Sequence, residues 1–346
     1  MKTVCIIGHF GFGETLLNGQ TVKTKVLANA AAGALGEEEL LFLDTHGGKK
    51  ALLKLPLLCF DRMRRCRNIV IMPAQNGLRI ITPLLTVYNL FFRRQLHYVV
   101  IGGWLDSFLK NRGLLTWMLK QFHGIYVETG GMKAALEAMG FANVYVMPNC
   151  KDLVPLKKQE LVLPEAEPYR LCTFSRVMKE KGIEEAVEAV KAVNARLGRS
   201  VYTLDIYGQV EPSQKAWFEQ LVDSFPEEIT YAGSVPFAES VGTLKKYFAL
   251  LFPTYYQGEG FAGTLIDAFF AGIPVVASRW KYNEEIVTEG LVGTFVPPRD
   301  AEALAQRLLE IQTAPESWNA MKENCLLRAA EYAPETVSRV LLDRLQ

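Results

Sequence analysis

The chain has 346 residues, of which 49% are hydrophobic and 22% are charged. This composition is typical of a globular protein with room for two domains, and it excludes collagen-like, disordered and disulfide-scaffold chains. The formal net charge is only +1, yet residues 1–150 carry 17 Lys and Arg against 9 Asp and Glu, whereas residues 151–346 carry 21 against 28. A basic half joined to an acidic half suggests two bodies with different partners.

The cysteines and the apolar runs indicate the class of protein. Six cysteines are spread thinly and form no C-x-x-C pair, which is typical of reduced thiols in a cytoplasmic protein. The chain opens directly into a strand pattern, so no signal peptide is expected. No apolar run reaches the roughly 18 residues that a membrane-spanning helix needs. We therefore expect a cytoplasmic protein.

Short apolar runs alternate with helical patterns along both halves, which predicts parallel sheets covered by helices. The predicted strands of the first half are 4–8, 39–44, 68–74, 97–103, 124–129 and 143–149. Those of the second half are 169–175, 202–208, 229–233, 248–253, 273–278 and 292–298. Between them lies a stretch with Pro155, Pro164 and Pro168, which is typical of a linker. The sequence thus predicts an α/β protein with two domains, 1–155 and 165–325, each built on a parallel sheet, and a helical tail at 326–346.

The segment 251–278, LFPTYYQGEGFAGTLIDAFFAGIPVVAS, is the strongest candidate for chemistry. A strand ends near Pro253, a Gly-rich loop follows, and a helix is expected to begin near Gly263 and to end at Gly272. The free amides of that helix N-terminus suit a diphosphate. Two carboxylates, Glu259 in the loop and Asp267 in the expected first turn, suit sugar hydroxyls. A generic strand–loop–helix unit is the competing interpretation.

This segment resembles the E-x7-E pattern of family 4 glycosyltransferases, which have the GT-B fold. The pattern is matched at Pro253, Glu259, Gly260, Phe261, Ala268, Gly272, Pro274, Val275, Ala277 and Ser278. The chain departs from it at Ala262, where the family often has Gly, and at Asp267, where the second Glu usually stands. The resemblance implies two Rossmann-like domains whose parallel sheets face each other across a cleft, with the nucleotide sugar in the second domain and the acceptor in the first. It also implies that the helical tail, 326–346, packs back on the first domain.

Further segments of the second half match the family in the expected order. The stretch 171–189 resembles the segment in which an Arg and a Lys neutralise the donor diphosphate, here Arg176 and Lys181. The strand end near Ser234 and Val235 resembles the segment that holds the nucleobase. Taken alone, without the resemblance, the two cations fit a solvated surface pair better than a phosphate site.

In the first half, GHFGFG occupies the place of the family's Gly-rich loop, and Gly11 and Gly13 would let backbone amides approach the donor. They are equally compatible with a simple tight turn. Many family members have a His after the fourth strand, but this chain has Gly102, Gly103 and Trp104 there, and His97 is expected at the other end of that strand. Candidates for the acceptor side are His9, Trp104 and Asp106.

The resemblance assigns a role to each candidate residue. The catalytic set is Glu259, Arg176 and Lys181, with Glu259 near the 3- and 4-hydroxyls of the donor sugar. The donor-binding set is Gly11, Gly13, Ser234, Val235, Gly260, Phe261, Ala262, Gly263, Thr264 and Asp267.

The first half also carries a basic cluster next to apolar and aromatic residues. Its members are Arg62, Arg64, Arg65, Arg67, Arg93 and Arg94. Such a cluster could rest on an anionic membrane and meet a lipid-linked acceptor. No nucleic-acid-binding motif accompanies it, so we expect no nucleic acid partner. A solvated helix face is the plain alternative.

The resemblance implies a retaining glycosyltransferase that moves a hexosyl unit from a nucleotide sugar, most simply a UDP-sugar, to a glycan or lipid-linked acceptor in bacterial surface polysaccharide synthesis. No D-x-D occurs in the chain, so no metal and no other cofactor are expected. Two alternatives stay open: a non-catalytic protein that binds sugar nucleotides, and a sugar-nucleotide epimerase with the same fold.

Overall fold

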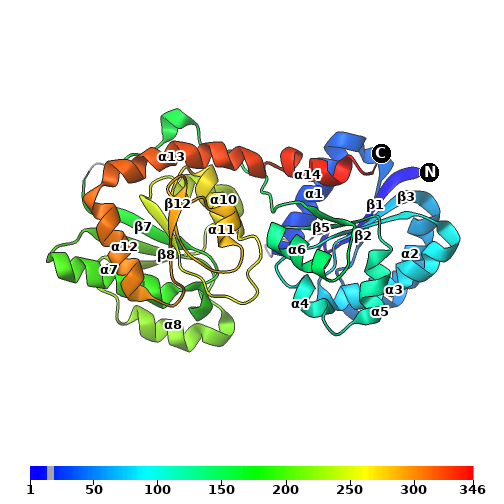
Figure 1. The fold of residues 1–346 in the computed structure, drawn as a ribbon, viewed down its shortest axis with the longest axis horizontal. Coiled ribbons are helices and arrows are strands. Elements are labelled where there is room, and N and C mark those ends of the chain that lie inside the picture. Colours follow the sequence, from blue (N-terminus) through cyan, green and yellow to red (C-terminus); the bar gives the residue numbers. More distant parts are fainter. Residues whose placement is uncertain (14–18, 165, 346) are drawn as a thin grey trace. The chain divides into compact units, whose positions relative to one another are not determined.

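The computed structural model describes residues 1–13, 19–164 and 166–345, and the chain divides into two compact units (Figure 1). Unit 1 comprises Met1–Asp152 together with Tyr332–Gln346, and unit 2 comprises Leu153–Glu331. Unit 2 therefore begins inside the proline-containing stretch, and the chain returns to unit 1 at residue 332 rather than at the predicted residue 326. The reason is that Trp318, Cys325 and Ala329 are buried in unit 2 and keep their helix there.

Within the described residues, unit 1 contains a six-stranded parallel sheet of order β2-β1-β3-β4-β5-β6. Val4, Ile6 and Val70 lie in its core, because apolar residues on central strands are covered on both faces. The strands are β1 (Lys2–Gly8), β2 (Leu40–Asp44), β3 (Cys66–Ile71), β4 (Gln95–Val99), β5 (Gly124–Val127) and β6 (Val144–Val146).

Helices pack against both faces of this sheet. Figure 1 shows the last helix lying against the first, and both contribute to one apolar core. In that core Leu341 and Leu345 are buried with Val26 and Leu27. The helices are α1 (Gly19–Leu35), α2 (Gly48–Arg65), α3 (Gln75–Phe92), α4 (Leu105–Leu109), α5 (Gly113–Lys120), α6 (Gly130–Ala138) and α14 (Pro334–Leu342).

Unit 2 repeats the architecture, again with a six-stranded parallel sheet in the part of the chain that the structure describes, of order β12-β11-β10-β7-β8-β9. The strands are β7 (Tyr169–Phe174), β8 (Tyr202–Tyr207), β9 (Ile229–Gly233), β10 (Ala249–Phe252), β11 (Val275–Ser278) and β12 (Gly293–Val296). Because all pairs are parallel, the loops that follow the strands gather at one edge of the sheet, where open α/β sheets bind ligands.

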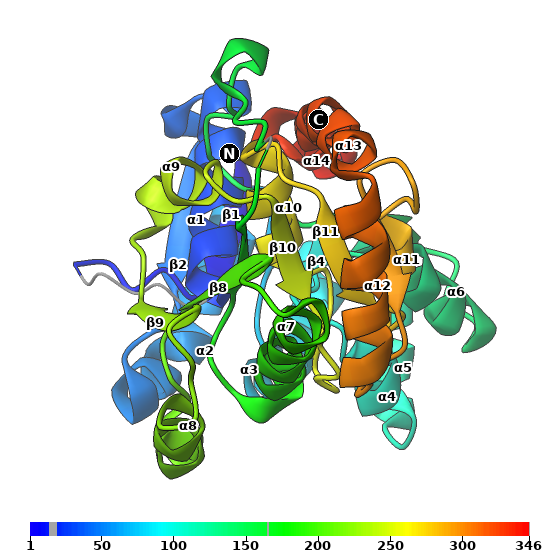
Figure 2. The same ribbon diagram turned by 90° about the vertical axis from the view of Figure 1, so that its left-hand side faces the viewer.

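The helices of unit 2 hold this edge in place. Helices α7 and α12 lie side by side over one part of the sheet (Figure 2), while α10 packs against α9 and α13. The helices are α7 (Ile183–Leu197), α8 (Lys215–Val222), α9 (Ser240–Leu244), α10 (Gly263–Phe270), α11 (Asn283–Ile286), α12 (Ala301–Thr313) and α13 (Pro315–Ala329). Among the described residues, no helix combines the length and the apolar character needed to cross a bilayer.

Candidate active site

The loop between β10 and α10 carries the predicted Gly-rich motif. Helix α10 begins at Gly263, and Gly272 follows its end with a φ of 64°, so both predicted helix boundaries are confirmed. The first amides of any α-helix have no acceptor within the helix, and they carry its positive dipole end. Helix α10 has no acidic residue in its first turn. The expectation for Asp267 was therefore wrong, since this residue lies one turn further along.

Lys181 and Glu259 form an ion pair at the centre of the loop. The Lys181 Nζ atom lies 2.6 Å from Glu259 Oε2, and both side chains are nearly buried. The hydroxyl of the buried Thr254 donates to the same carboxylate oxygen at 2.9 Å. Lys181 Nζ also lies 5.3 Å from the centre of the Tyr256 ring and 5.4 Å from that of Phe252. The cation is thus held in one place by charge and by two aromatic faces.

The backbone around Lys181 fits tightly against the end of β10. Gly182 has a φ of 74°, and a Cβ atom there would lie 2.3 Å from the carbonyl oxygen of Pro253. The amide of Tyr255 donates to the carbonyl of Glu180 at 2.8 Å. Glycine at position 182, just before α7, is therefore required by close packing, because a side chain there would clash with Pro253.

Arg176 lies on the loop after β7, beside the start of α10. The Thr264 hydroxyl donates to the carbonyl of Phe174, which joins the first turn of α10 to the end of β7. The Arg176 side chain is half exposed, and its Nη1 donates to Glu211 at 2.9 Å. Arg176 thus comes from the strand end next to the helix amides, but its guanidinium is paired with a carboxylate that the sequence analysis did not consider.

Asp267 faces the protein interior. Its side chain is buried, and Ser240 at the start of α9 donates to its Oδ1 atom at 3.3 Å. Glu259, by contrast, is bound to Lys181 and Thr254. The two acids therefore have different partners, and Asp267 links α10 to the helix that follows the β9 loop.

The other predicted donor residues surround this loop. Ser234 is exposed and Val235 half buried in the segment between β9 and α9. Gly260, Phe261 and Ala262 are buried ahead of α10, and Gly263 and Thr264 at its first turn are half exposed. Of these five residues ahead of and at the start of α10, the two at the helix start are thus the more accessible to solvent.

In unit 1, the Gly-rich turn after β1 is bound to the end of β2. Asp44 accepts hydrogen bonds from the amides of Phe10 at 2.9 Å and Phe12 at 3.1 Å. Gly11 and Gly13 have φ values of 58° and 86°, which glycine adopts readily. Burial raises the pKa of Asp44, but hydrogen bonds from the amides of His46, Phe10 and Phe12 outweigh it, so the pKa is lowered. Two amides of this turn are therefore directed at Asp44, which the sequence analysis missed. The segment 14–18, which continues the loop, lies outside the described residues.

His9 belongs to a small polar cluster at the same edge. Its Nδ1 atom lies 2.8 Å from the hydroxyl of Thr21, and its Nε2 atom lies 3.1 Å from His46 Nδ1. Trp104, by contrast, donates through its Nε1 to the carbonyl of Ile101 at 2.7 Å, and its ring packs edge-on against Phe108. Asp106 is half buried in the first turn of α4. Trp104 thus stabilises the loop after β4, whereas His9 and His46 place two imidazole rings, which can accept or donate protons, at this edge of the sheet.

A buried ion pair occupies the carboxyl edge of unit 1. Lys23 Nζ on α1 lies 2.5 Å from Glu128 Oε1, directly after β5, and each side chain is 4% exposed. The amide of Gly102 donates to Glu128 Oε2 at 3.1 Å. The carboxylate therefore stands next to the loop in which many family members carry a His. A strand that ends in an acid, GIYVE, is the signal that could have identified Glu128.

Within residues 1–13, 19–164 and 166–345, no three or more His, Cys, Asp or Glu side chains are grouped as a metal site would require. All six cysteines are buried as free thiols.

Residues 168–313 match the family model described as "Glycosyl transferases group 1". The amylovoran biosynthesis glycosyltransferase AmsK of Erwinia amylovora is 28% identical over 150 residues, or 42% of this chain and 36% of that protein. The putative colanic acid biosynthesis glycosyltransferase WcaL of Salmonella typhimurium is 27% identical over 181 residues, or 51% and 43%. The matched segments thus span less than half of these relatives.

Two of the solved structures that resemble this chain match it over its full length. Anabaena HepE, solved in complex with UDP, has a TM-score of 0.76 at 14% identity, covering 100% of this chain and 99% of that one. Sucrose-phosphate synthase from Thermosynechococcus elongatus has a TM-score of 0.72 at 16% identity, covering 100% and 98%. The predicted fold class is therefore confirmed as two Rossmann-like domains of GT-B type. Together these results identify residues 168–313 as a glycosyl transferases group 1 domain within a chain of GT-B fold.

Proposed function

We propose that the protein is a retaining glycosyltransferase of family 4 that transfers a hexosyl unit from a UDP-sugar to a glycan or lipid-linked acceptor. The observation that carries the proposal is the Lys181–Glu259 pair ahead of α10, inside the group 1 domain. It places a fixed cation and a carboxylate beside free helix amides, and these groups suit the diphosphate and the sugar of such a donor.

The choice of donor draws on the structural neighbours. HepE has been solved with UDP, with UDP and glucose, and with UDP-glucose. In this chain, the amides at Gly263 and Thr264 would face the diphosphate, with Arg176 and Lys181 as the cations. Ser234 and Val235 would lie along the base, and Asp267 would act through Ser240 by fixing the segment that leads from β9 to α9.

The chemistry follows from charge. The bond between the anomeric carbon and the diphosphate oxygen breaks, the same carbon bonds to the acceptor oxygen, and the acceptor hydroxyl loses a proton. Negative charge grows on the leaving UDP, so cations and amides aimed at it lower the barrier. In this scheme Glu259 holds Lys181 in position and accepts hydrogen bonds from the hydroxyls of the donor sugar. The acceptor binds to unit 1, where the His9–His46 pair offers a base.

The relatives AmsK and WcaL carry names from exopolysaccharide biosynthesis. We therefore propose bacterial surface polysaccharide as the product class and the cytoplasm as the location.

The test begins with a thermal-shift panel of nucleotide sugars, because a donor that binds the native state raises Tm by mass action. The donor that stabilises the protein is then incubated with and without candidate acceptors, and released UDP and labelled glycan are measured. Transfer that depends on acceptor supports the proposal. Conversion of the donor sugar without acceptor would identify an epimerase. Binding with neither product would identify a non-catalytic protein.

A further inference from the structure

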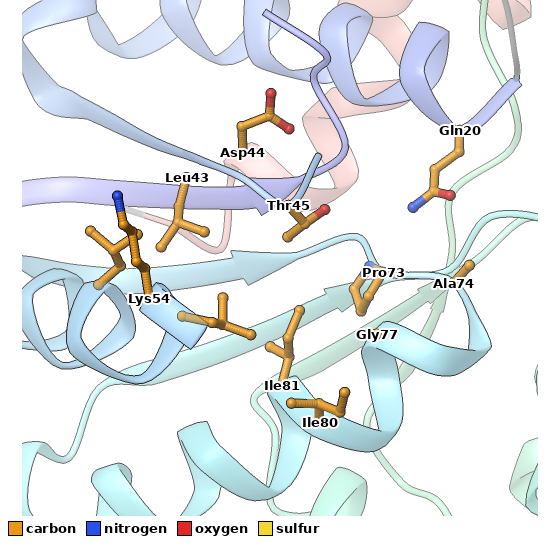
Figure 3. A pocket seen from close by; sticks show the side chains of 12 residues that line it. Gln20, Leu43, Asp44, Thr45, Lys54, Pro73, Ala74, Gly77, Ile80 and Ile81 are labelled. Atoms are coloured by element: carbon orange, nitrogen blue, oxygen red, sulfur yellow. The ribbon is translucent and has the colours of Figure 1, made fainter. Parts of the chain in front are cut away.

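A hydrophobic groove runs between α2 and α3 of unit 1, and its inner end reaches Asp44 beside the Gly-rich turn. It consists of two adjoining cavities of about 390 and 370 Å³, and both are lined by Leu55 and Ile80. Figure 3 shows the inner cavity, where Ile80, Ile81 and Gly77 of α3 lie opposite Leu43 and Lys54. The outer cavity continues along the two helices to Pro56, Pro83, Leu84 and Val87.

The inner end of the groove opens among polar groups. Gln20, Asp44 and Thr45 line it at the carboxyl edge of the sheet. Asp44 is the residue that holds the Gly-rich turn, and its neighbour His46 contacts His9. Lys54 is the cation among the residues that line this cavity. The groove therefore leads from groups that suit a sugar and a phosphate to walls of hydrocarbon.

The outer end of the groove opens onto exposed apolar side chains. Leu57 on α2 is 78% exposed, and Phe91 on α3 is 80% exposed. Each belongs to a stripe of apolar residues that are three, four or seven positions apart, so the members of a stripe lie on one side of their helix. The stripes are Leu53, Leu57 and Phe60 on α2, and Ile80, Val87 and Phe91 on α3. Contiguous apolar surface of this kind marks a binding site in a folded protein.

Charge indicates what covers this surface. Residues 53–94 contain eight Lys and Arg and a single acid, Asp61. Arg64, Arg65, Arg67 and Arg93 are exposed where the two helices end. Two members of the basic cluster predicted from the sequence are placed differently: Arg62 is half buried against Asp61, and Arg94 Nε donates to the carbonyl of Met63. Apolar stripes edged by arginines complement an anionic lipid surface.

We propose that the α2–α3 groove binds the single hydrocarbon chain of a phosphate-bearing lipid, with its phosphate beside Lys54 and its polar head at Asp44 and Thr45. Resting on the proposed function, this lipid is the acceptor, and its head group presents the hydroxyl that receives the sugar. The exposed stripes then lie on the anionic membrane from which the lipid is drawn.

The test uses farnesyl phosphate and dodecyl phosphate below their micelle concentrations, with inorganic phosphate as the head-group control, all by isothermal titration calorimetry. We expect both amphiphiles to bind and inorganic phosphate not to bind. Ile80→Glu places a charge in both cavities and should weaken binding at least tenfold. Lys54→Met should weaken it several-fold. Leu327→Glu on α13 of unit 2, where the leucine is 68% exposed, is the matched control and should bind as the natural chain does.

Three results would contradict the proposal that the groove binds lipid. One is the absence of amphiphile binding, and another is an Ile80→Glu variant that binds as tightly as the natural chain. A third is a dimer by light scattering that Ile80→Glu dissociates without any lipid binding, since a second copy would then cover the face. The fraction of protein that sediments with vesicles of phosphatidylglycerol and phosphatidylethanolamine should be lower for Leu57→Glu than for the natural chain, and it should be unchanged for Leu327→Glu.

The same variants separate this proposal from the proposed function. Donor binding to unit 2, measured by thermal shift with the UDP-sugar, should be unchanged in Ile80→Glu, while transfer to a lipid acceptor is lost. Amphiphile binding without any nucleotide-sugar turnover would leave the groove as a lipid site and refute the transferase. Transfer to water-soluble acceptors without amphiphile binding would support the transferase and refute the lipid site.

Discussion

Lys181 and Glu259 are 78 residues apart in the chain, yet their charged atoms are separated by 2.6 Å. The pair joins the start of α7 to the loop before α10, so two loops from neighbouring strands share one buried charge pair. The aromatic faces of Phe252 and Tyr256 complete the enclosure of the cation. A diphosphate that arrives at α10 would meet a cation that is already oriented, which lowers the cost of organising the site.

Replacing Lys181 with Met should lower transfer by about 10²- to 10³-fold, because one fixed positive charge at the leaving group is removed. The measurement is kcat/KM for UDP release with the donor found by thermal shift. Lys215→Met on α8 is the control, since Lys215 is 72% exposed and its Nζ lies 3.5 Å from Glu219 Oε1, on the same helix. A folded Lys181→Met variant with normal turnover would contradict the proposed role.

The two glycines that flank α7 test the packing of this loop. Gly182 and Gly198 have similar φ values, 74° and 63°, but a Cβ at Gly198 would meet nothing within 4 Å. Gly198→Ala should cost about 1–2 kcal/mol of unfolding free energy from the left-handed backbone alone. Gly182→Ala should cost at least about 2 kcal/mol more, because its Cβ would meet Pro253, and it should also reduce turnover. Urea unfolding measures both, and equal losses would show that the contact with Pro253 does not matter.

The Lys23–Glu128 pair should behave as a buried ion pair. Lys23→Met or Glu128→Gln alone should cost about 3–5 kcal/mol of unfolding free energy, because each leaves an uncompensated buried charge. The double variant should recover part of that loss. The exposed pair Lys158–Glu323, with charged atoms 2.7 Å apart, is the control and should contribute less than about 1 kcal/mol. Additive losses at Lys23 and Glu128 would disprove the coupling.

His97 should make the protein sensitive to acid. It lies within β4, its Nδ1 atom is 3.1 Å from the Tyr126 hydroxyl, and burial, with smaller contributions from His123 and Arg344, lowers its pKa to about 3. In the unfolded chain His97 binds a proton near pH 6.5, whereas in the folded chain it stays neutral down to about pH 3. The contribution of neutral His97 to the free energy of unfolding is therefore fully present above pH 6.5 and is lost as the pH falls toward 3.

His97→Gln removes this group and should flatten the pH dependence. Between pH 7.5 and 4.5 the natural chain should lose about 2–3 kcal/mol more than the variant in urea unfolding. Equal losses in the two proteins would show that His97 is protonated in the folded state.

Local patterns predicted the fold well. The apolar runs gave the twelve strands that the described residues contain, and the glycines at 263 and 272 gave both ends of α10. The order of the elements also predicted that Lys181 and Glu259 lie at the same edge of the sheet. Each residue follows a parallel strand, and the carboxyl ends of parallel strands lie at one edge.

Long-range packing could not be predicted in the same way. Asp267 faces Ser240, and nothing in the spacing of the motif indicates which side of α10 is covered by α9. The carboxylate of Asp44 is visible as a strand-end acid, but its hydrogen bonds to Phe10 and Phe12 depend on how the turn is folded. The partner of Arg176, Glu211, follows a different strand and has no sequence signal.

The return of α14 to unit 1 has a consequence for synthesis on the ribosome. Asn68 Nδ2 donates to the carbonyl of Leu345, 277 residues away, and Leu341 and Leu345 fill the core beside α1. Unit 2 is encoded entirely within 153–331, so it can close while unit 1 still lacks a helix. The domain translated first is therefore completed last, and the apolar side of α1 needs protection until that final helix emerges.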